Sequence, residues 1–351
     1  MEKYMNVDKR MTMEDAISKY VNDGESFVYA NCLTGMPLAL THELIRSGKK
    51  NLMLFDQASI EEIDMLIEAR VIDRLVTTFN FRVGGKRTTS PLERALKERR
   101  LKIEELSNLT MLSMMKAGAM GYSFIPVLSG IKMADFVKRS NYLGNQRFGE
   151  VKDPFTGKKQ LVVKGYNPDF AFMHVQRADT AGNGQMWGAM FNSKWAALAA
   201  NKIILTCEKI VDAEVIKSSP HLTIAPSFKV CAVIECPWGA HPSELAGFYD
   251  NDFPFRALYF ATLGSSASIK TWMDEWIYGI KDRGEYLAHY VEKLGTESLD
   301  VLRAKPRLSV PADYGNANSY EWDESGYNRS LDMNMSQFVE FLDKKGVLLQ
   351  S

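Results

Sequence analysis

Residues 236–242 read CPWGAHP and place the thiol of Cys236 five positions before the imidazole of His241. Such a pair can be a nucleophile with its base, or part of a metal site. A reactive cysteine, however, is usually found at a helix N-terminus or beside an oriented base. Cys236 instead ends the apolar stretch VCAVIEC, where a free cysteine behaves as a small core residue. The pattern favours a packing role for Cys236 and a hydrogen-bonding role for His241 in a rigid loop.

A glycine pair surrounded by basic residues lies in segment 79–91, FNFRVGGKRTTSP. Gly84 and Gly85 allow the backbone to approach a ligand closely. Arg82 and the basic residues after the glycines add positive charge, which suits a phosphate or a carboxylate. A solvated basic turn explains the same residues equally well, so the residues alone leave both interpretations open.

A second candidate loop lies in segment 23–37, DGESFVYANCLTGMP. An apolar strand runs directly into a turn that contains Thr34 and Gly35, and a helix follows. In open α/β sheets, ligands bind at the carboxyl ends of the strands. A single glycine is more typical of an ordinary strand–helix connection, so the residues alone favour that interpretation.

Two further groups of polar residues lie on predicted strands. Glu104 and Glu105 are adjacent, so they point to opposite faces and at most one of them can face a given pocket. A pair of surface carboxylates is the usual explanation of such a doublet. His174 and Gln176 alternate and therefore share a face, shortly before the Gly-Asn-Gly turn that follows Asp179. They form either a polar pocket wall or a strand end that Asp179 ties to its turn.

The composition excludes several classes of protein. Apolar residues make up 46% and charged residues 25% of the 351 residues, and the formal net charge is zero, so no basic excess favours nucleic acid or an acidic membrane. The first twenty residues lack the apolar core of a signal peptide, and no apolar run is long enough to span a bilayer. Four scattered cysteines without a CxxC pair argue against a disulfide framework and a structural zinc site. We expect a cytoplasmic protein without a metal.

Strands and helices alternate along most of the chain, which predicts an α/β fold. Its sheet should be open and mostly parallel, with helices on both faces. After about residue 252 the pattern becomes helical. We expect an N-terminal segment at 1–11, one α/β domain at 12–310, and a C-terminal extension at 311–351 that ends in an amphipathic docking helix.

Taken together, several segments resemble the α (A) subunit of family I CoA-transferases, of the glutaconate CoA-transferase type. They are HELIRSGKKNLML, LERALKERRLKIEELS, MMKAGAMGYSFIPV, HVQRADTAGN and GAHPSELAGFYDNDFPF, in the family's order between about residues 12 and 302. The resemblance implies the NagB/RpiA-like fold and, as the partner, a homologous β subunit. It also implies CoA transfer between carboxylic acids, with the thioester as substrate and no permanently bound cofactor.

In this family, a glutamate of the β subunit carries the CoA as a thioester, so the resemblance places no nucleophile in this chain. It places Thr34 and Gly35 in the first substrate loop and Arg82, Gly84 and Gly85 in the second. Residues 30–32, Ala-Asn-Cys, stand where the family has Gly-Gly-Phe, which predicts a different acyl pocket.

Two alternatives accompany the transferase interpretation. A branch with the same fold consists of ring-cleaving hydrolases of CoA thioesters from steroid catabolism, which use an acidic residue of the α subunit. Under that alternative, Glu105 is the general base. The other alternative is a non-catalytic assembly subunit.

Overall fold

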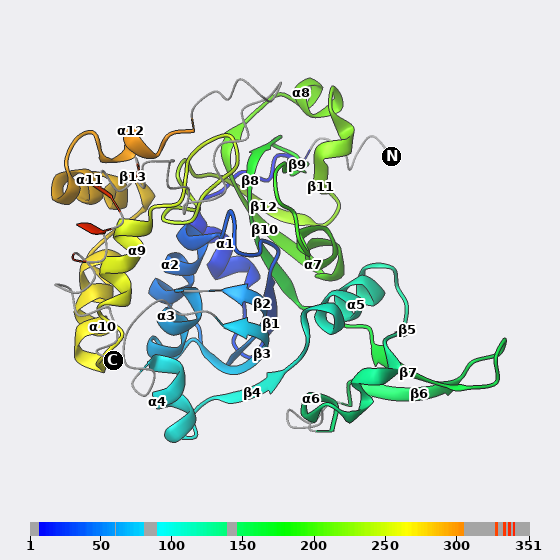
Figure 1. The fold of residues 1–351 in the computed structure, drawn as a ribbon. Coiled ribbons are helices and arrows are strands. Elements are labelled where there is room, and N and C mark those ends of the chain that lie inside the picture. The colour runs from blue at the N-terminus through cyan, green and yellow to red at the C-terminus, as the bar shows by residue number, and fades with distance from the viewer. Residues whose placement is uncertain are drawn as a thin grey trace.

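The computed structural model describes residues 7–59, 61–80, 90–138 and 146–304, together with 327–328, 333–334, 336–337 and 340. Within these residues, a nine-stranded sheet contains seven parallel strands in the order β12-β10-β8-β1-β2-β3-β4 (Figure 1). Their bounds are β1 (Ser26–Tyr29), β2 (Leu52–Ser59), β3 (Ile72–Asn80), β4 (Lys102–Glu105), β8 (Phe170–Ala178), β10 (Lys202–Ile210) and β12 (Val230–Glu235). Short antiparallel strands β9 (Gly184–Gln185) and β11 (Thr223–Ala225) continue from the end of β8. The predicted open, mostly parallel sheet is confirmed.

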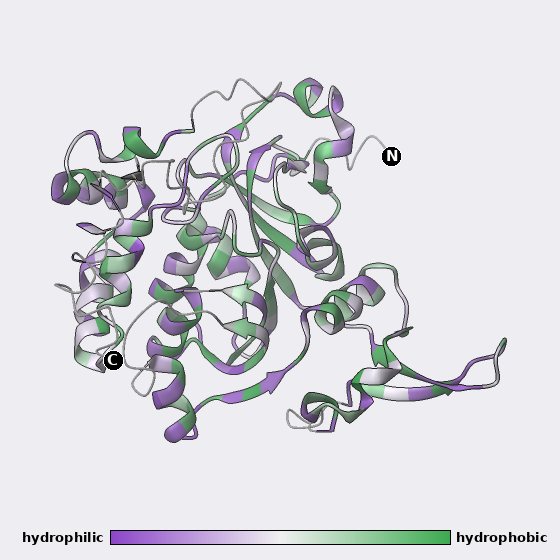
Figure 2. Ribbon diagram, in the orientation of Figure 1, coloured by the Kyte–Doolittle hydropathy of each residue, from purple (hydrophilic) through white to green (hydrophobic). Residues whose placement is uncertain are grey.

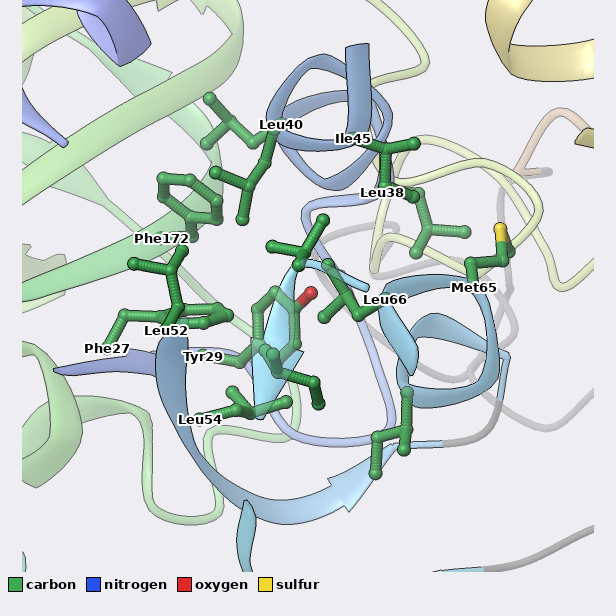
Figure 3. Packing of buried hydrophobic residues seen from close by; sticks show 14 of the residues in the cluster. Phe27, Tyr29, Leu38, Leu40, Ile45, Leu52, Leu54, Met65, Leu66 and Phe172 are labelled. Atoms are coloured by element: carbon green, nitrogen blue, oxygen red, sulfur yellow. The ribbon is translucent and has the colours of Figure 1, made fainter. Parts of the chain in front are cut away.

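Helices cover both faces of this sheet, as predicted. One face carries α1 (Met13–Tyr20), α2 (Leu38–Arg46), α3 (Glu62–Glu68) and α4 (Pro91–Lys97), and the other carries α5 (Asn108–Ala119) and α7 (Ser193–Ala199). Because successive strand residues point to opposite faces, Phe27 and Leu54 belong to the first layer, and Val28 and Phe55 to the second. Figure 3 shows the first layer, where Phe27 and Leu54 meet side chains of α2 and α3.

Local capping explains where several of these helices begin. Thr12 accepts a hydrogen bond from the N–H of Asp15 at the start of α1, and Ser90 accepts one from Glu93 at the start of α4. Helix α2 follows Pro37, whose ring suits the first turn of a helix. All three helices begin where the sequence predicts.

A small antiparallel sheet, here called the arm, departs from the predicted alternation of strands and helices. Strands β5 (Phe124–Pro126), β7 (Lys159–Lys164) and β6 (Phe148–Lys152) form a separate antiparallel sheet beside η3 (Ser129–Met133) and α6 (Asp135–Lys138). Figure 1 shows this arm extending away from the main sheet, and Figure 2 shows hydrophilic stretches along its hairpin, whereas the central strands are apolar.

A buried ion pair fastens the arm to the sheet. Arg147, just before β6, donates from Nε to Glu104 Oε1 of β4 at 2.5 Å, and both side chains are at most 3% exposed. The guanidinium also lies over the rings of Phe55 and Tyr166, at 5.5 and 5.8 Å from their centroids. Burial raises the pKa of Glu104, which the Arg147 hydrogen bond opposes. The two carboxylates lie on opposite faces of β4, as predicted, but the expected surface pair is wrong for Glu104, which is buried, and correct only for Glu105, which is exposed.

After residue 252 the described chain is mostly helical, as expected. This part comprises α9 (Phe253–Phe260), α10 (Ser266–Met273), the π-helical turn η5 (Asp274–Tyr278), α11 (Arg283–Leu294) and α12 (Ser298–Leu302). Two short helices, α8 (Ala213–Lys217) and η4 (Pro220–Leu222), lie earlier, between β10 and β11. Short strands β13 (Tyr327–Asn328) and β14 (Met333–Asn334) pair with each other. Most of the predicted docking helix lies outside the described residues. Within the described part, every helix is too short or too polar to cross a bilayer.

Replacing Glu104 with glutamine should lower the free energy of unfolding by about 3 kcal/mol, because Arg147 keeps its charge in a buried site without a counterion. Urea denaturation measures this change. The adjacent Glu105→Gln is the matched control, and it should change the stability by less than about 0.5 kcal/mol. Replacing both partners by methionine should restore most of the loss. If Glu104→Gln unfolds at the wild-type urea concentration, the ion pair does not stabilise the protein.

Candidate functional site at the carboxyl edge of the sheet

The loop after β1, residues 30–37, packs against the loop after β12, residues 236–252. The N–H of Gly35 donates to the carbonyl of Glu244 at 2.7 Å. Both loops follow parallel strands, so they meet at the carboxyl edge, where open α/β sheets bind ligands. Thr34 and Gly35, the predicted substrate residues, lie at this junction.

A third loop, residues 186–192, adjoins the first two. Thr34 Oγ1 donates to the carbonyl of Ala189 at 3.4 Å. Gly188 has a φ of +94°, and a Cβ at this position would lie 2.6 Å from the Cβ of Ala246. The close approach requires a glycine there. The three loops therefore form one contiguous surface.

Side chains of strand β8 hold these loops in place through hydrogen bonds. His174 and Gln176 are fully buried and share a face, as their alternation predicts. Gln176 Nε2 donates to the carbonyls of Trp187 at 2.9 Å and Ala246 at 3.2 Å, so one side chain holds two loops. Asp179 accepts two hydrogen bonds within its own turn. Of the two predicted roles, the structural one applies, because neither His174 nor Gln176 faces an open pocket.

Glu208 on β10 is the centre of a buried polar network. Its carboxylate accepts hydrogen bonds from His174 Nε2 at 2.9 Å, Tyr249 Oη at 2.7 Å and the N–H of Trp238 at 2.9 Å. Burial alone would raise the pKa of Glu208, but bonds from His174 and Trp238 outweigh it and lower that pKa. Sequence reasoning missed Glu208, although a carboxylate inside the apolar strand β10 signals a buried polar contact.

Asn31 connects the first loop to the same network. Its Oδ1 accepts from the N–H of His174 at 2.9 Å, and its Nδ2 donates to the His174 carbonyl at 3.0 Å. The amide thus continues the pairing of β1 with β8 beyond the last residue of β1. A Cβ on Gly35, whose φ is +64°, would lie 3.0 Å from Asn31 Nδ2. The packing of the chain itself therefore requires a glycine at position 35.

The CPWGAHP segment contains no catalytic couple. Cys236 is 2% exposed, and burial raises its pKa to about 12. His241 Nε2 donates to Asp252 Oδ2 at 2.9 Å, and its Nδ1 lies 3.0 Å from Tyr286 Oη, so both ring nitrogens are engaged. Burial also lowers the pKa of His241, which favours the neutral ring. The imidazole fixes its loop, as expected.

Of the remaining predicted site residues, the structure places only Glu105, and it places Glu105 away from this surface. Arg82, Gly84 and Gly85 lie outside the described residues. Glu105 is exposed on the edge strand β4, and three strand spacings, about 14 Å, separate β4 from β1. Among the residues that the structure describes, no cluster of three His, Cys, Asp or Glu side chains is arranged to hold a metal ion.

Gly35→Ala should lower the free energy of unfolding by about 1–3 kcal/mol, because the new methyl group is strained at this φ and meets Asn31. Gly48→Ala is the matched control, since Gly48 has a φ of +70° and open space around a Cβ. The difference between the two losses, measured by urea denaturation, reports the contact with Asn31. Equal losses would show that the contact is unimportant.

Iodoacetamide at pH 8 should leave Cys236 unmodified in the folded protein, because the thiol is buried and its pKa of about 12 leaves almost no thiolate. Peptide mass spectrometry after a short incubation measures the modification at each cysteine. The urea-denatured chain serves as the control and should react completely. Rapid modification of Cys236 in the folded protein would restore the nucleophile interpretation.

Comparison with known proteins identifies relatives over most of the chain. The family model described as Coenzyme A transferase matches residues 10–236. The A subunit of glutaconate CoA-transferase from Acidaminococcus fermentans is 30% identical over 318 residues, which are 88% of this chain and 98% of that protein. The A subunit of 3-oxoadipate CoA-transferase from Pseudomonas knackmussii is 32% identical over 288 residues, 80% of this chain and 98% of that protein. A protein from Archaeoglobus fulgidus is 30% identical over 307 residues, but these are only 66% of its length.

Solved structures agree with these sequence matches. The crystal structure of glutaconate coenzyme A-transferase from Acidaminococcus fermentans matches with a TM-score of 0.76 and 28% identity, covering 88% of this chain and 98% of that chain. A variant of the decarboxylase AibA/AibB matches with a TM-score of 0.63 and 26% identity, covering 76% of this chain and 98% of that chain. By its family match and by its relatives, the chain belongs to the coenzyme A transferase family.

Proposed function

We propose that this chain is the α subunit of a heteromeric acyl-CoA:carboxylate CoA-transferase and works with a homologous β subunit. One observation carries the proposal: two relatives that the chain covers over 98% of their length are both named as the A subunit of a CoA-transferase. Coenzyme A enters and leaves as part of the substrates, without a permanently bound cofactor. A location in the cytoplasm is part of the same proposal and rests on the cysteine content.

The proposed reaction proceeds through covalent carriers on the partner subunit. A glutamate carboxylate of the partner attacks the thioester carbonyl, and the C–S bond breaks to give a mixed anhydride and the CoA thiolate. The thiolate then attacks the glutamyl carbonyl, which releases the donor acid and leaves a glutamyl-CoA thioester. The acceptor acid takes the CoA by the reverse steps. Each tetrahedral intermediate requires hydrogen-bond donors for its oxyanion.

The contribution of this chain is the rigid surface around Thr34 and Gly35. The N–H groups of these two residues already donate to the carbonyls of Cys32 and Glu244, each at 2.7 Å. They are therefore not the oxyanion donors in this conformation. The Thr34 hydroxyl, which makes only a long bond to Ala189, is the polar group of the pair that remains for a ligand. The loop of Arg82, Gly84 and Gly85 is proposed as a second wall.

Coexpression with the β subunit should give a complex that exchanges CoA between an acyl-CoA and an acceptor acid. Hydroxylamine or borohydride should trap the activated glutamate on the partner subunit when acyl-CoA is added without acceptor. Mass spectrometry of both subunits measures the adduct, and each isolated subunit is a control. Failure to exchange CoA with any acyl-CoA would contradict the proposal.

The same assay separates the alternatives. A hydrolase would release free CoA or a ring-opened thioester without an acceptor acid, and Glu105→Gln would abolish that release while the complex stays assembled. If this chain were non-catalytic, the isolated β subunit would be as active as the complex. Release of carbon dioxide would indicate the chemistry of the decarboxylase relative.

A further inference from the structure

Each of the three carboxyl-edge loops holds one bulky apolar residue in the left-handed backbone region. The φ angles are +63° for Leu33, +41° for Phe191 and +60° for Trp238. This region is unfavourable for such side chains. The other non-glycine residues with positive φ in the described ranges are polar and lie outside these loops (Asn51, Arg70, Arg99). Strained residues of this kind tend to occur where a loop contacts a ligand.

Two of the three conformations are explained by contacts within the chain. Trp238 is 6% exposed, stacks on Tyr249 at 4.3 Å, and donates its N–H to Glu208. Leu33 is partly buried, and its carbonyl accepts a hydrogen bond from Ser243 Oγ at 3.2 Å. Phe191 differs, because its side chain is 58% exposed. Phe191 therefore exposes its aromatic ring to solvent, and no burial of that ring offsets the cost of its strained backbone.

The two residues after Phe191 add a second, independent observation. Asn192 is 3% exposed and Ser193 is 1% exposed, yet Asn192 Oδ1 and Ser193 Oγ have no hydrogen-bond partner. Asn192 occupies the N-cap position of α7 but does not cap the helix, because its backbone is not extended there. Buried polar atoms without partners are rare in folded proteins and indicate a missing water or ligand.

We propose that residues 191–193 contact the acyl-CoA substrate along its chain, with Phe191 as a residue that determines affinity. The proposal rests on the function proposed above. The segment begins two residues after Ala189, whose carbonyl contacts Thr34 in the substrate loop. An acyl-CoA chain combines methylene groups, which suit an aromatic ring, with amide groups, which suit Asn192 Oδ1 and Ser193 Oγ. Because both polar atoms are shielded in the free chain, the loop must shift when the ligand binds.

This assignment makes an unusual prediction about stability. Glycine tolerates positive φ, so Phe191→Gly should remove strain, and Ser193→Ala should remove an unpaired buried hydroxyl. Neither variant should lower the melting temperature of the coexpressed complex. Both should nevertheless weaken binding, by about tenfold for Phe191→Gly and about fivefold for Ser193→Ala. A purely structural role would show the opposite, a loss of stability with unchanged affinity.

Isothermal titration of the complex with CoA, acetyl-CoA and hexanoyl-CoA tests the proposal. If a variant loses the same factor of affinity for all three probes, its residue contacts the pantetheine arm. If the loss of affinity grows with the length of the acyl chain, the residue contacts the acyl group. Phe228→Gly is the matched control, because Phe228 is 81% exposed in the turn before β12, at the opposite edge of the sheet. It should bind every probe like the wild type.

Three results would overturn the inference. The first is an unchanged dissociation constant for every probe in Phe191→Gly, and the second is binding of none of the probes by the wild-type complex. The third is loss of assembly in Phe191→Gly, which would assign the ring to the subunit interface. Binding is measured separately from turnover, so a complex that binds acyl-CoA through residues 191–193 but transfers no CoA would refute only the proposed function.

Discussion

The hydrogen bonding of one buried carboxylate, that of Glu208, organises the candidate site. A carboxylate removed from water is costly unless donors surround it. Here the donors come from strand β8 and from the loop after β12. Satisfying this single group therefore fixes the ring of His174 and the loop backbone at Trp238. Gly239 completes the arrangement, since a Cβ there would lie 2.6 Å from His174 Cε1.

Much of the fold was predictable because it depends on local patterns. Apolar strands, the caps at Thr12 and Ser90, and the shared face of His174 and Gln176 follow from residue type and spacing, and the structure agrees with each. In the arm, β5 and β6 are short and partly exposed, so their sequences show no clear period. The apolar, buried centre of β7, residues 161–163, is a strand signal that sequence reasoning missed. The attachment of the arm depends on Arg147 meeting Glu104 across 43 positions, and no local pattern reveals such a pairing.

The candidate site was less predictable, for a related reason. A glycine in a loop suggests a place where a ligand approaches, yet Gly35 and Gly188 make room for Asn31 and Ala246 of the same chain. Spacing along a sequence does not tell which neighbour fills the space beside a glycine. The resemblance of several motifs to CoA-transferases identified the family correctly, whereas the roles of Glu105 and of the Arg82 loop stay predictions.

The attachment of two loops to Gln176 also bears on how this surface can change. Gln176 bonds to backbone carbonyls, so these two hydrogen bonds do not themselves require particular side chains at residues 187 and 246. Side chains at the exposed positions of the same loop, such as Ala189, are therefore open to substitution while the frame keeps its shape. A fold built this way allows ligand preference to diverge without redesign of the core. Such independence suits a scaffold whose relatives carry names as different as transferase and decarboxylase.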